Sequence, residues 1–469
     1  MNIPQILYIA AMVIYVLFFL LFLRYFWWKR YAEVNYWKRR PDLSRCMVLR
    51  LAEEKGVEVP FIAVLIPARN EADVIGRTID HMTRMNYPKD RYEIIVITDE
   101  KEILARPEGE LSPTTQDIVQ QKIEELRSRG RGSLLKHVMV PYDFEGRFGG
   151  ACIEEWVPST KGRALNYGLS FLDPRVEMCG FFDAESRPDP GVLLYIAYRR
   201  LVDGDKARMF QGPVFQVRNF YQMGPLSKIA SLYQSITHEW YMPVLMKRLP
   251  FVGGTNLFVE RALLEQIGGF DHLALTEDLE LGARAYLEAG AWPEYLPYSS
   301  TEQTPSTYRA FFRQRLRWGT GHLQVVDKFR KENKYPWEKK GPLLRKLFWK
   351  GQGEWVFYQS AVMVPLIVLT LSATGQMDNS LVPRVIREGL ATTILVYFAF
   401  TFYAFWKYSP YLDSSSRPRT WLGRYAALSQ LFCLPVAAFF FPLPYSSALV
   451  LRALHKQPQL WIKTPRTRE

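Results

Sequence analysis

Residues 61–71 read FIAVLIPARNE, an apolar run of strand length that ends abruptly in a polar turn. Three later stretches follow a similar pattern: YEIIVITD (92–99), HVMVPYD (137–143) and GFFDAES (180–186). Between the strands, residues 72–85 and 116–129 have helical patterns. Short buried strands that alternate with helices are typical of βαβ units. The sequence therefore predicts an α/β fold with a mostly parallel sheet and flanking helices.

Acidic residues follow the predicted strands. Ligands of open parallel sheets bind beyond the carboxyl ends of the strands, and here those ends carry Glu71, Asp99, Asp183 and Glu185. Asp183 and Glu185 are separated by one residue and point the same way in an extended chain. Such a pair suits Mg²⁺ or Mn²⁺ beside phosphate oxygens, although an ordinary acidic loop explains it equally well. The sequence contains no GxGxxG dinucleotide fingerprint and no GxxxxGK[ST] P-loop.

The stretch LTEDLELGARAYLEAG (275–290) has two interpretations. In the structural one, Thr276 is the N-cap of a helix, and Glu277 and Asp278 are favourable at its positive end. In the chemical one, the two carboxylates act in catalysis. The stretch alone favours capping.

The stretch QRLRWGTG (314–321) is also ambiguous. If residues 308–329 form a helix, Gln314, Arg317 and Trp318 stand at i, i+3 and i+4 and share one face. This face is either the edge of an interfacial helix with snorkelling arginines or a set of binding side chains.

The chain is strongly apolar near both ends. Residues 1–23 contain no Asp, Glu, Lys or Arg, and about 20 helical residues cross a hydrocarbon core of about 30 Å. The segment lacks the charged start and small-residue cleavage site of a signal peptide, which favours a retained anchor. Basic residues follow it, with Trp27 and Trp28 at headgroup depth. This pattern predicts that the next segment starts in the cytoplasm.

Three later apolar runs, 355–373, 389–406 and 425–451, predict further transmembrane helices, with buried helices of a soluble core as the alternative. Pro435, Pro442 and Pro444 interrupt the last run. That run therefore spans once, spans twice or re-enters, and the sequence leaves the choice open. We expect a multi-pass integral protein of the plasma membrane.

The formal net charge is +13, which favours an anionic partner. A phosphorylated substrate and the surface of a lipid bilayer account for this charge. No nucleic-acid-binding module or clustered basic arm is found, so no nucleic acid is expected. The four cysteines are scattered without a CxxC pattern, which makes a zinc site or a disulfide framework unexpected.

The order of the motifs is more specific than any one of them. PARNE, Asp99, STKGRALNYG, FFDAES, VGGTN, TED and QRLRW follow one another over residues 61–318. This order resembles the membrane-bound processive family 2 glycosyltransferases, which include cellulose, chitin, hyaluronan and poly-N-acetylglucosamine synthases. The resemblance implies a nucleotide-sugar-binding domain of GT-A type, which transfers a sugar with inversion of the anomeric carbon.

The resemblance also implies roles for individual residues. The nucleotide-sugar site would comprise Pro67, Arg69, Asn70, Glu71, Asp99, Lys161 and Asp183. Asp183 and Glu185 would hold Mg²⁺ or Mn²⁺, although the family pattern is DxD and the second acid here is Glu. Asp278 resembles the general base. Glu277, Gln314, Arg317 and Trp318 would bind the acceptor or the diphosphate, whereas Arg315 is assigned to lipid or structure.

The predicted organisation follows from these motifs. It comprises a transmembrane helix (1–27), a basic juxtamembrane linker (28–60), a cytoplasmic GT-A domain (61–305), interfacial helices (306–351), two or three transmembrane helices (352–452) and a basic tail (453–469).

The predicted function is transfer from a UDP-sugar to a growing β-linked polysaccharide, coupled to export. The resemblance leaves room for export or regulatory partner proteins. One alternative is addition of a single sugar to a membrane lipid. Another is a non-enzymatic transporter or scaffold that carries acidic loops.

Overall fold

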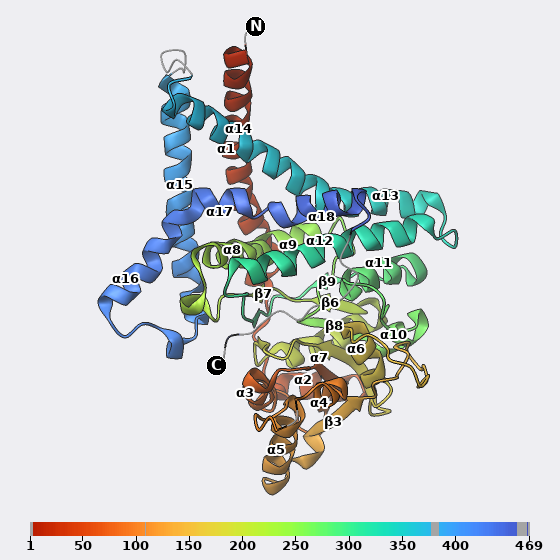
Figure 1. The fold of residues 1–469 in the computed structure, drawn as a ribbon. Helices are drawn as coiled ribbons and strands as arrows, with labels where there is room; N and C mark the ends of the chain where they lie inside the picture. Colours follow the sequence, from red (N-terminus) through yellow and green to blue (C-terminus); the bar gives the residue numbers. More distant parts are fainter. Residues whose placement is uncertain (1–2, 108, 377–383, 457–466, 468–469) are drawn as a thin grey trace.

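The computed structural model describes residues 3–107, 109–376, 384–456 and 467 (Figure 1). Its main sheet has the strand order β3-β2-β1-β4-β8-β6-β9. The strands are β1 (Phe61–Pro67), β2 (Tyr92–Asp99), β3 (Leu135–Val140), β4 (Val176–Phe181), β6 (Met209–Gln211), β8 (Leu257–Glu260) and β9 (Glu294–Tyr295). β8 is antiparallel to β4 and β6, and the other pairs are parallel. The predicted fold class, α/β with a mostly parallel sheet, is confirmed.

Helices cover both faces of this sheet because its central strand is apolar on both sides. In β1, Ile62, Val64 and Ile66 pack into one core cluster, and Ala63 and Leu65 pack into another. The first cluster includes side chains of α2 (Arg45–Glu54), α3 (Ala72–Met82), α5 (Thr115–Ser128) and α7 (Val192–Asp203). The second includes side chains of α6 (Lys161–Leu169), α10 (Arg261–Ile267) and α11 (Glu277–Ala289).

The predicted strand at 180–186 requires a correction. β4 ends at Phe181, and Asp183 and Glu185 lie in the turn that follows it. The prediction was displaced, since β4 begins at Val176 and shares only Gly180 and Phe181 with the predicted strand. The chain leaves the sheet before the first acidic residue. The strand predicted at 137–143 likewise begins earlier and ends at Val140.

A second, three-stranded sheet adjoins this turn. Its order is β5-β10-β7, formed by β5 (Arg187–Pro188), β10 (Ser300–Thr301) and β7 (Val214–Phe215). β10 is antiparallel to β5, and Thr301 pairs with Arg187. The pairing places the chain after β10 beside the turn after β4.

A belt of helices lies along one side of the α/β domain (Figure 1). It consists of α8 (Pro225–Ile236), the π-helical turn η5 (Thr237–Tyr241), α9 (Met242–Leu245), α12 (Tyr308–Lys331), α13 (Trp337–Phe348), a second π-helical turn η6 (Trp349–Gly353), α17 (Leu434–Phe440) and α18 (Leu443–Ala453). The helix predicted at 308–329 is thus present as α12. Its N-cap Thr307 accepts a hydrogen bond from the Ala310 amide at 3.3 Å.

Three long helices extend beyond the belt, away from the α/β domain: α1 (Ile3–Asn35), α14 (Glu354–Ala373) and α15 (Arg384–Tyr408) (Figure 1). The first helix was expected to end near residue 27, but it continues to Asn35. The reason is packing, because Trp28 and Ala32 beyond that point are buried.

The last apolar run is broken into pieces. α16 (Trp421–Ser429) is followed by the 3-10 turn η10 (Gln430–Cys433), α17 and α18. α18 packs along α12 (Figure 1), where Arg452 pairs with Asp327 at 2.6 Å. Of the predicted tail, only residues 453–456 and 467 belong to the part of the chain that the structure describes.

Within the described residues, two helical stretches are long and apolar enough to cross a membrane: Ile9–Arg39 and Trp421–Ala453. This assignment rests on length and composition alone. The domain boundaries and the number of membrane spans therefore stay predictions.

A buried histidine makes the stability of this fold depend on pH. His238 lies in η5, where its Nδ1 accepts a hydrogen bond from the Val214 amide at 3.1 Å. Burial first, and then the nearby Arg315 charge, lower the pKa of His238 to about 3. An unfolded histidine titrates near pH 6.5, so between these values the unfolded chain binds a proton that the folded chain does not. Stability is therefore full above about pH 6.5 and is lost as the pH falls.

We predict that His238→Asn flattens this dependence, because an amide oxygen keeps an acceptor for the Val214 amide and does not titrate. The midpoint of thermal unfolding in detergent, measured between pH 5 and 8, should change less with pH in the variant. The difference in slope is at most about 1.4 kcal/mol per pH unit, the value for one proton. The exposed His455→Asn is the control. An unchanged slope in His238→Asn would contradict the prediction.

Candidate active site

A cleft at the carboxyl ends of β1, β2 and β4 brings together residues that are distant in the sequence. Six of its lining residues were predicted to bind the nucleotide sugar: Pro67, Arg69, Glu71, Asp99, Lys161 and Asp183. The remaining lining residues are Ala68, Ile97, Thr98, Ser159, Thr160, Ala164 and Ala184. Asn70 has a positive φ of 55° and donates its amide to Glu102 Oε2 at 2.6 Å. It therefore shapes the turn after β1.

Asp99, at the end of β2, is buried and held by three groups. Its Oδ2 accepts hydrogen bonds from Ser159 Oγ at 2.6 Å and from the Arg163 guanidinium at 3.3 Å, and its Oδ1 accepts from the Lys101 amide at 3.0 Å. The roles of Ser159 and Arg163 were missed, although both belong to the STKGRALNYG stretch. An arginine within a helical motif gave no sign that it would be buried beside a strand end.

A cluster of three carboxylates adjoins the cleft at Asp183. Asp183, Glu185 and Glu302 each offer an oxygen, and these oxygens lie within 4.8 Å of one another. Glu185 and Glu302 are each only 1% exposed. The sequence predicted the first two residues and missed Glu302, which arrives through the pairing of two-residue strands that no pattern signals.

Lys161 connects this cluster to the next group of acids. As the first residue of α6, it pairs with Asp183 and donates to the Gly254 carbonyl at 2.6 Å. Burial alone would lower the pKa of Lys161, but Asp183, Glu277 and Asp278 together raise it. The lysine therefore carries its positive charge at neutral pH.

Glu277 and Asp278 occupy the first turn of α11. Burial is the largest cause that raises the pKa of both carboxyl groups, and the Asp278 charge further raises that of Glu277. Thr276 stands at the N-cap position, but among the described residues its hydroxyl finds no capping partner. Thr276 is thus the N-cap residue that the structural interpretation predicts, without the side-chain hydrogen bond of a cap. The raised pKa values are typical of carboxylates used in chemistry.

Gly254 shows how closely these groups converge. A Cβ atom added there would lie 3.1 Å from both Asp278 Oδ2 and Lys161 Nζ, and 3.7 Å from Glu277 Oε1. The second glycine of VGGTN thus occupies the space between the lysine and the two acids. A side chain at this position would separate them.

The QRLRW segment of α12 meets the same acids. Arg317 donates to the Leu275 carbonyl at 3.0 Å, and its charge lowers the pKa of Glu277 and Asp278. Gln314 is buried and Trp318 is partly exposed. The structure therefore brings Arg317 next to the TED acids. Acceptor binding by Gln314 and Trp318 stays a prediction.

Arg315 lies inside the protein. It is buried, its guanidinium stands 3.9 Å from the centre of the Trp318 ring, and it donates to Gln234 Oε1. Of the two roles expected for Arg315, lipid or structure, these contacts favour structure. The arginine covers one face of Trp318.

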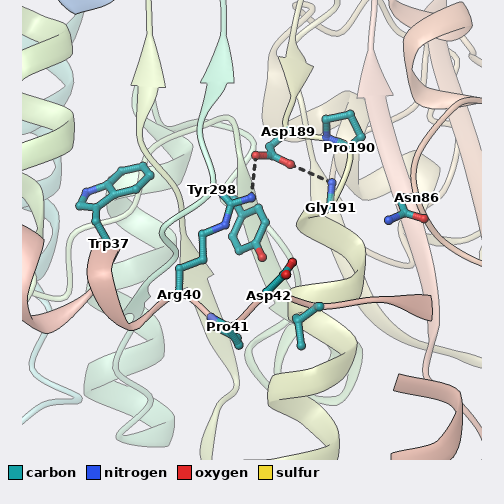
Figure 2. A pocket seen from close by; sticks show the side chains of 10 residues that line it. Trp37, Arg40, Pro41, Asp42, Asn86, Asp189, Pro190, Gly191 and Tyr298 are labelled. Carbon is teal, nitrogen blue, oxygen red and sulfur yellow. Dashed lines mark hydrogen bonds and ion pairs between the residues drawn. The ribbon is translucent and has the colours of Figure 1, made fainter. Parts of the chain in front are cut away.

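A second cavity, of ≈ 410 Å³ compared with ≈ 80 Å³ for the cleft, contains none of the predicted site residues. It separates the juxtamembrane segment from the α/β domain (Figure 2). Arg40 pairs there with Asp189 at 3.1 Å and stacks 3.7 Å from the centre of the Tyr298 ring. These two contacts of Arg40 hold the segment after α1 against the domain.

The cleft has the parts of a group-transfer enzyme. The cleft presents Asp99 at the end of β2, Glu71 at the start of α3, and Lys161 beside Asp183. Asp278, whose pKa is raised by burial, lies close to Lys161 across Gly254. Such an order can bind a nucleoside diphosphate and act on the group attached to it.

Comparison with known proteins identifies the class. Residues 181–443 match the glycosyl transferase family group 2, which is more than half of the chain, and the protein belongs to this family. The chain therefore has a GT-A-like fold and is a member of a family of glycosyl transferases. Family membership decides against the non-enzymatic alternative.

Individual proteins match the chain at low sequence identity and over part of its length. The probable glycosyltransferase YdaM of Bacillus subtilis (strain 168) is 31% identical over 276 residues, which are 58% of this chain and 57% of that protein. The β-monoglucosyldiacylglycerol synthase of Synechocystis sp. (strain ATCC 27184 / PCC 6803 / Kazusa) is 25% identical over 57% of this chain and 49% of its own length. The chain thus spans about half of the length of these relatives.

Among solved structures, the mannosyltransferase PcManGT from Pyrobaculum calidifontis, in complex with GDP-Man and Mn²⁺, is similar. It covers 92% of this chain and 99% of its own, at 19% identity and a TM-score of 0.48.

The close approach of side chains at Gly254 can be tested with a matched pair of variants. Gly254→Ala should reduce sugar transfer on the order of 100-fold, because the new methyl group displaces Asp278 and Lys161 by a few tenths of an ångström. Gly253→Ala is the control, since its Cβ would come no closer than 3.7 Å to Gln211. Turnover and the midpoint of thermal unfolding should be measured for both. Equal turnover in the two variants would contradict this geometry.

The predicted stacking of an acceptor sugar on Trp318 can be tested with a second pair of variants. Trp318→Ala should lower kcat/KM for the acceptor at least about tenfold, or about 1.4 kcal/mol, because a flat apolar ring packs on the C–H face of a sugar. Donor hydrolysis should be less affected. Arg315→Ala should have a smaller effect on kcat/KM and should mainly lower the unfolding midpoint. An effect of Trp318→Ala on donor hydrolysis as large as that on transfer would assign the ring to the donor instead.

Proposed function

We propose that the protein is an inverting, membrane-embedded glycosyltransferase that transfers sugar from a UDP-sugar to a growing β-linked polysaccharide, processively and coupled to export. The observation that carries the proposal is the position of Lys161. It stands between Asp183 at the donor end and Asp278 at the acceptor end, with Gly254 leaving the space between them open.

The residues take the following roles in one displacement. Asp278 accepts the proton of an acceptor hydroxyl while that oxygen attacks the anomeric carbon. The bond from this carbon to the diphosphate breaks, and the electron pair leaves with the diphosphate. The ammonium of Lys161 offsets the charge that develops there. A single attack from the opposite face converts an α-linked donor into a β-glycoside.

The donor is held by the groups at the strand ends. Asp99 and Glu71 face the nucleoside, and Arg69 lies beside them in the cleft. Asp99 is fixed by Ser159 and Arg163, which makes it a rigid acceptor for base N–H groups. The fit of a carboxylate to such groups supports a nucleotide donor without deciding the sugar.

The carboxylate cluster fits a divalent cation. Oxygen donors that lie so close together, two of them buried, form the donor set that Mg²⁺ and Mn²⁺ prefer. Asp183 and Glu185 would hold the ion, which when bound supplies positive charge to the leaving diphosphate.

The membrane proposal rests on the exposed apolar surface of α1. Val13, Val16 and Leu20 are 61%, 52% and 56% exposed. A surface of this kind is unfavourable in water and favourable in hydrocarbon. With α14 and α15 beside α1, we propose a multi-pass membrane protein whose catalytic domain is cytoplasmic.

One observation supports a second class of acceptor, a membrane lipid. A relative at 25% identity is named for a monoglucosylated diacylglycerol product. In the alternative function, the same site adds a single sugar to a membrane lipid. Donor binding and the role of Asp278 are the same in both cases, and only the acceptor differs.

The decisive experiment uses the full chain in nanodiscs. UDP- and GDP-sugars are offered with Mg²⁺ or Mn²⁺, with and without added diacylglycerol, and released nucleotide and product mass are measured. We expect a UDP-sugar to be used and a polymer to form, and Asp278→Asn to lose at least about 100-fold in turnover. A product with one sugar would establish the lipid alternative. Equal turnover by wild type and Asp278→Asn would overturn the mechanism.

A further inference from the structure

Glu302 reaches the donor end of the cleft from a separate part of the fold. It directly follows β10, whose Thr301 pairs with Arg187 of β5, and β5 begins two residues after Glu185. The second sheet therefore carries Glu302 across a sequence distance of more than one hundred residues to the turn that holds Asp183. Its carboxylate is one of the three whose oxygens lie within 4.8 Å of one another.

The Glu302 side chain is held in a fixed orientation. Its Oε1 accepts hydrogen bonds from Thr255 Oγ1 at 2.6 Å and from Ser186 Oγ. Its backbone is held as well, since the amide donates to the Phe215 carbonyl at 3.0 Å and the carbonyl accepts from the Arg218 amide at 3.1 Å. Both hydroxyls bind the same oxygen and fix its direction.

The same hydroxyls tie Glu302 to the predicted metal residues. Asp183 donates its amide to Ser186 Oγ at 3.0 Å and to Thr255 Oγ1 at 3.3 Å. Ligating carboxylates in metal sites are commonly held by such outer hydrogen bonds, which set the direction of the ligand atoms. The arrangement around Glu302 has this form.

The spacing of the three oxygens suits one ion. Oxygens bound to the same Mg²⁺, Mn²⁺ or Ca²⁺ at about 2.0–2.6 Å lie at most about 4–5 Å apart. The separations in the cluster stay within 4.8 Å. Two of the three carboxylates are buried, and a divalent cation beside them would lower the repulsion between their charges.

We propose that Glu302 is a third protein ligand of the divalent cation, supplied by the second sheet. The proposal rests on the proposed function, because it concerns the metal that the donor site would use. It has a consequence of its own. Three carboxylates bind the ion firmly enough that the protein takes up Mn²⁺ before any nucleotide sugar arrives.

The test measures metal binding without turnover. The full chain in nanodiscs is stripped of metal and titrated with MnCl₂ in the absence of nucleotide, and free Mn²⁺ is followed by electron paramagnetic resonance. We expect one ion per wild-type chain. Glu302→Gln should weaken binding at least about tenfold, because the amide keeps an oxygen for Ser186 and Thr255 but loses the charge.

Two further variants separate metal binding from folding. Thr255→Val removes one orienting hydroxyl and leaves all three carboxylates, so it should weaken Mn²⁺ binding by a smaller factor than Glu302→Gln. Glu265→Gln removes a half-exposed carboxylate on α10 and should bind Mn²⁺ like the wild type. The unfolding midpoint without metal should not fall in Glu302→Gln if its role is ligation.

The outcomes are distinct. Equal Mn²⁺ affinity in wild type and Glu302→Gln, with loss in Asp183→Asn, would overturn the proposal and give Glu302 a purely structural role. Absence of Mn²⁺ binding to the wild type without nucleotide would overturn it as well. Neither result touches the proposed function, which stands or falls on nucleotide release and product mass in the donor panel.

Discussion

The ion pair between Lys161 and Asp183 is the interaction on which the site depends. The ends of parallel strands collect acidic residues at one edge of the sheet, and such residues repel one another when buried. Lys161 begins α6 and therefore enters this edge from the helix that covers one face of β1. By also contacting the Gly254 carbonyl, it keeps the turn after β4 and the VGGTN loop at a fixed separation. Lys161 thus both balances the charge of the cleft and fixes its shape.

The acceptor end depends on close packing between helices. A Cβ atom added at Gly321 of α12 would lie 2.5 Å from Thr276 Cγ2, so only glycine lets α12 approach the start of α11 this closely. On another side of α12, Gln352 of η6 donates to the Gly319 carbonyl at 2.8 Å. Gly319 and Gly321 therefore let α12 pack between the TED motif and η6, the turn that leads into α14. The helix expected at this segment is present, and its glycines are closely packed against neighbouring elements.

Most of the α/β core was predictable because its signals are local. Each of β1 to β4 begins as an apolar run, and the residues that follow a parallel strand must lie at the ligand-binding edge, so Glu71, Asp99 and Asp183 could be placed from the sequence. Glu302 could not be placed, because two-residue strands leave no periodic pattern. Nor could the burial of Arg163 be foreseen, since it depends on carbonyl groups of Phe144 and Pro141 that become neighbours only in the folded chain.

In the proposed function, the arrangement of the belt would let donor and acceptor approach from different sides. The nucleotide end of the cleft is formed by the strand ends of the α/β domain, whereas the TED end is covered by α12, which belongs to the belt (Figure 1). The long apolar helices leave from this same belt. A soluble nucleotide sugar can therefore enter from the domain side, while an acceptor that is bound to or leaves through a membrane would meet Asp278 from the belt side. In the proposed function, Lys161 lies between the two, and the reacting bond would form where the α/β domain meets the belt.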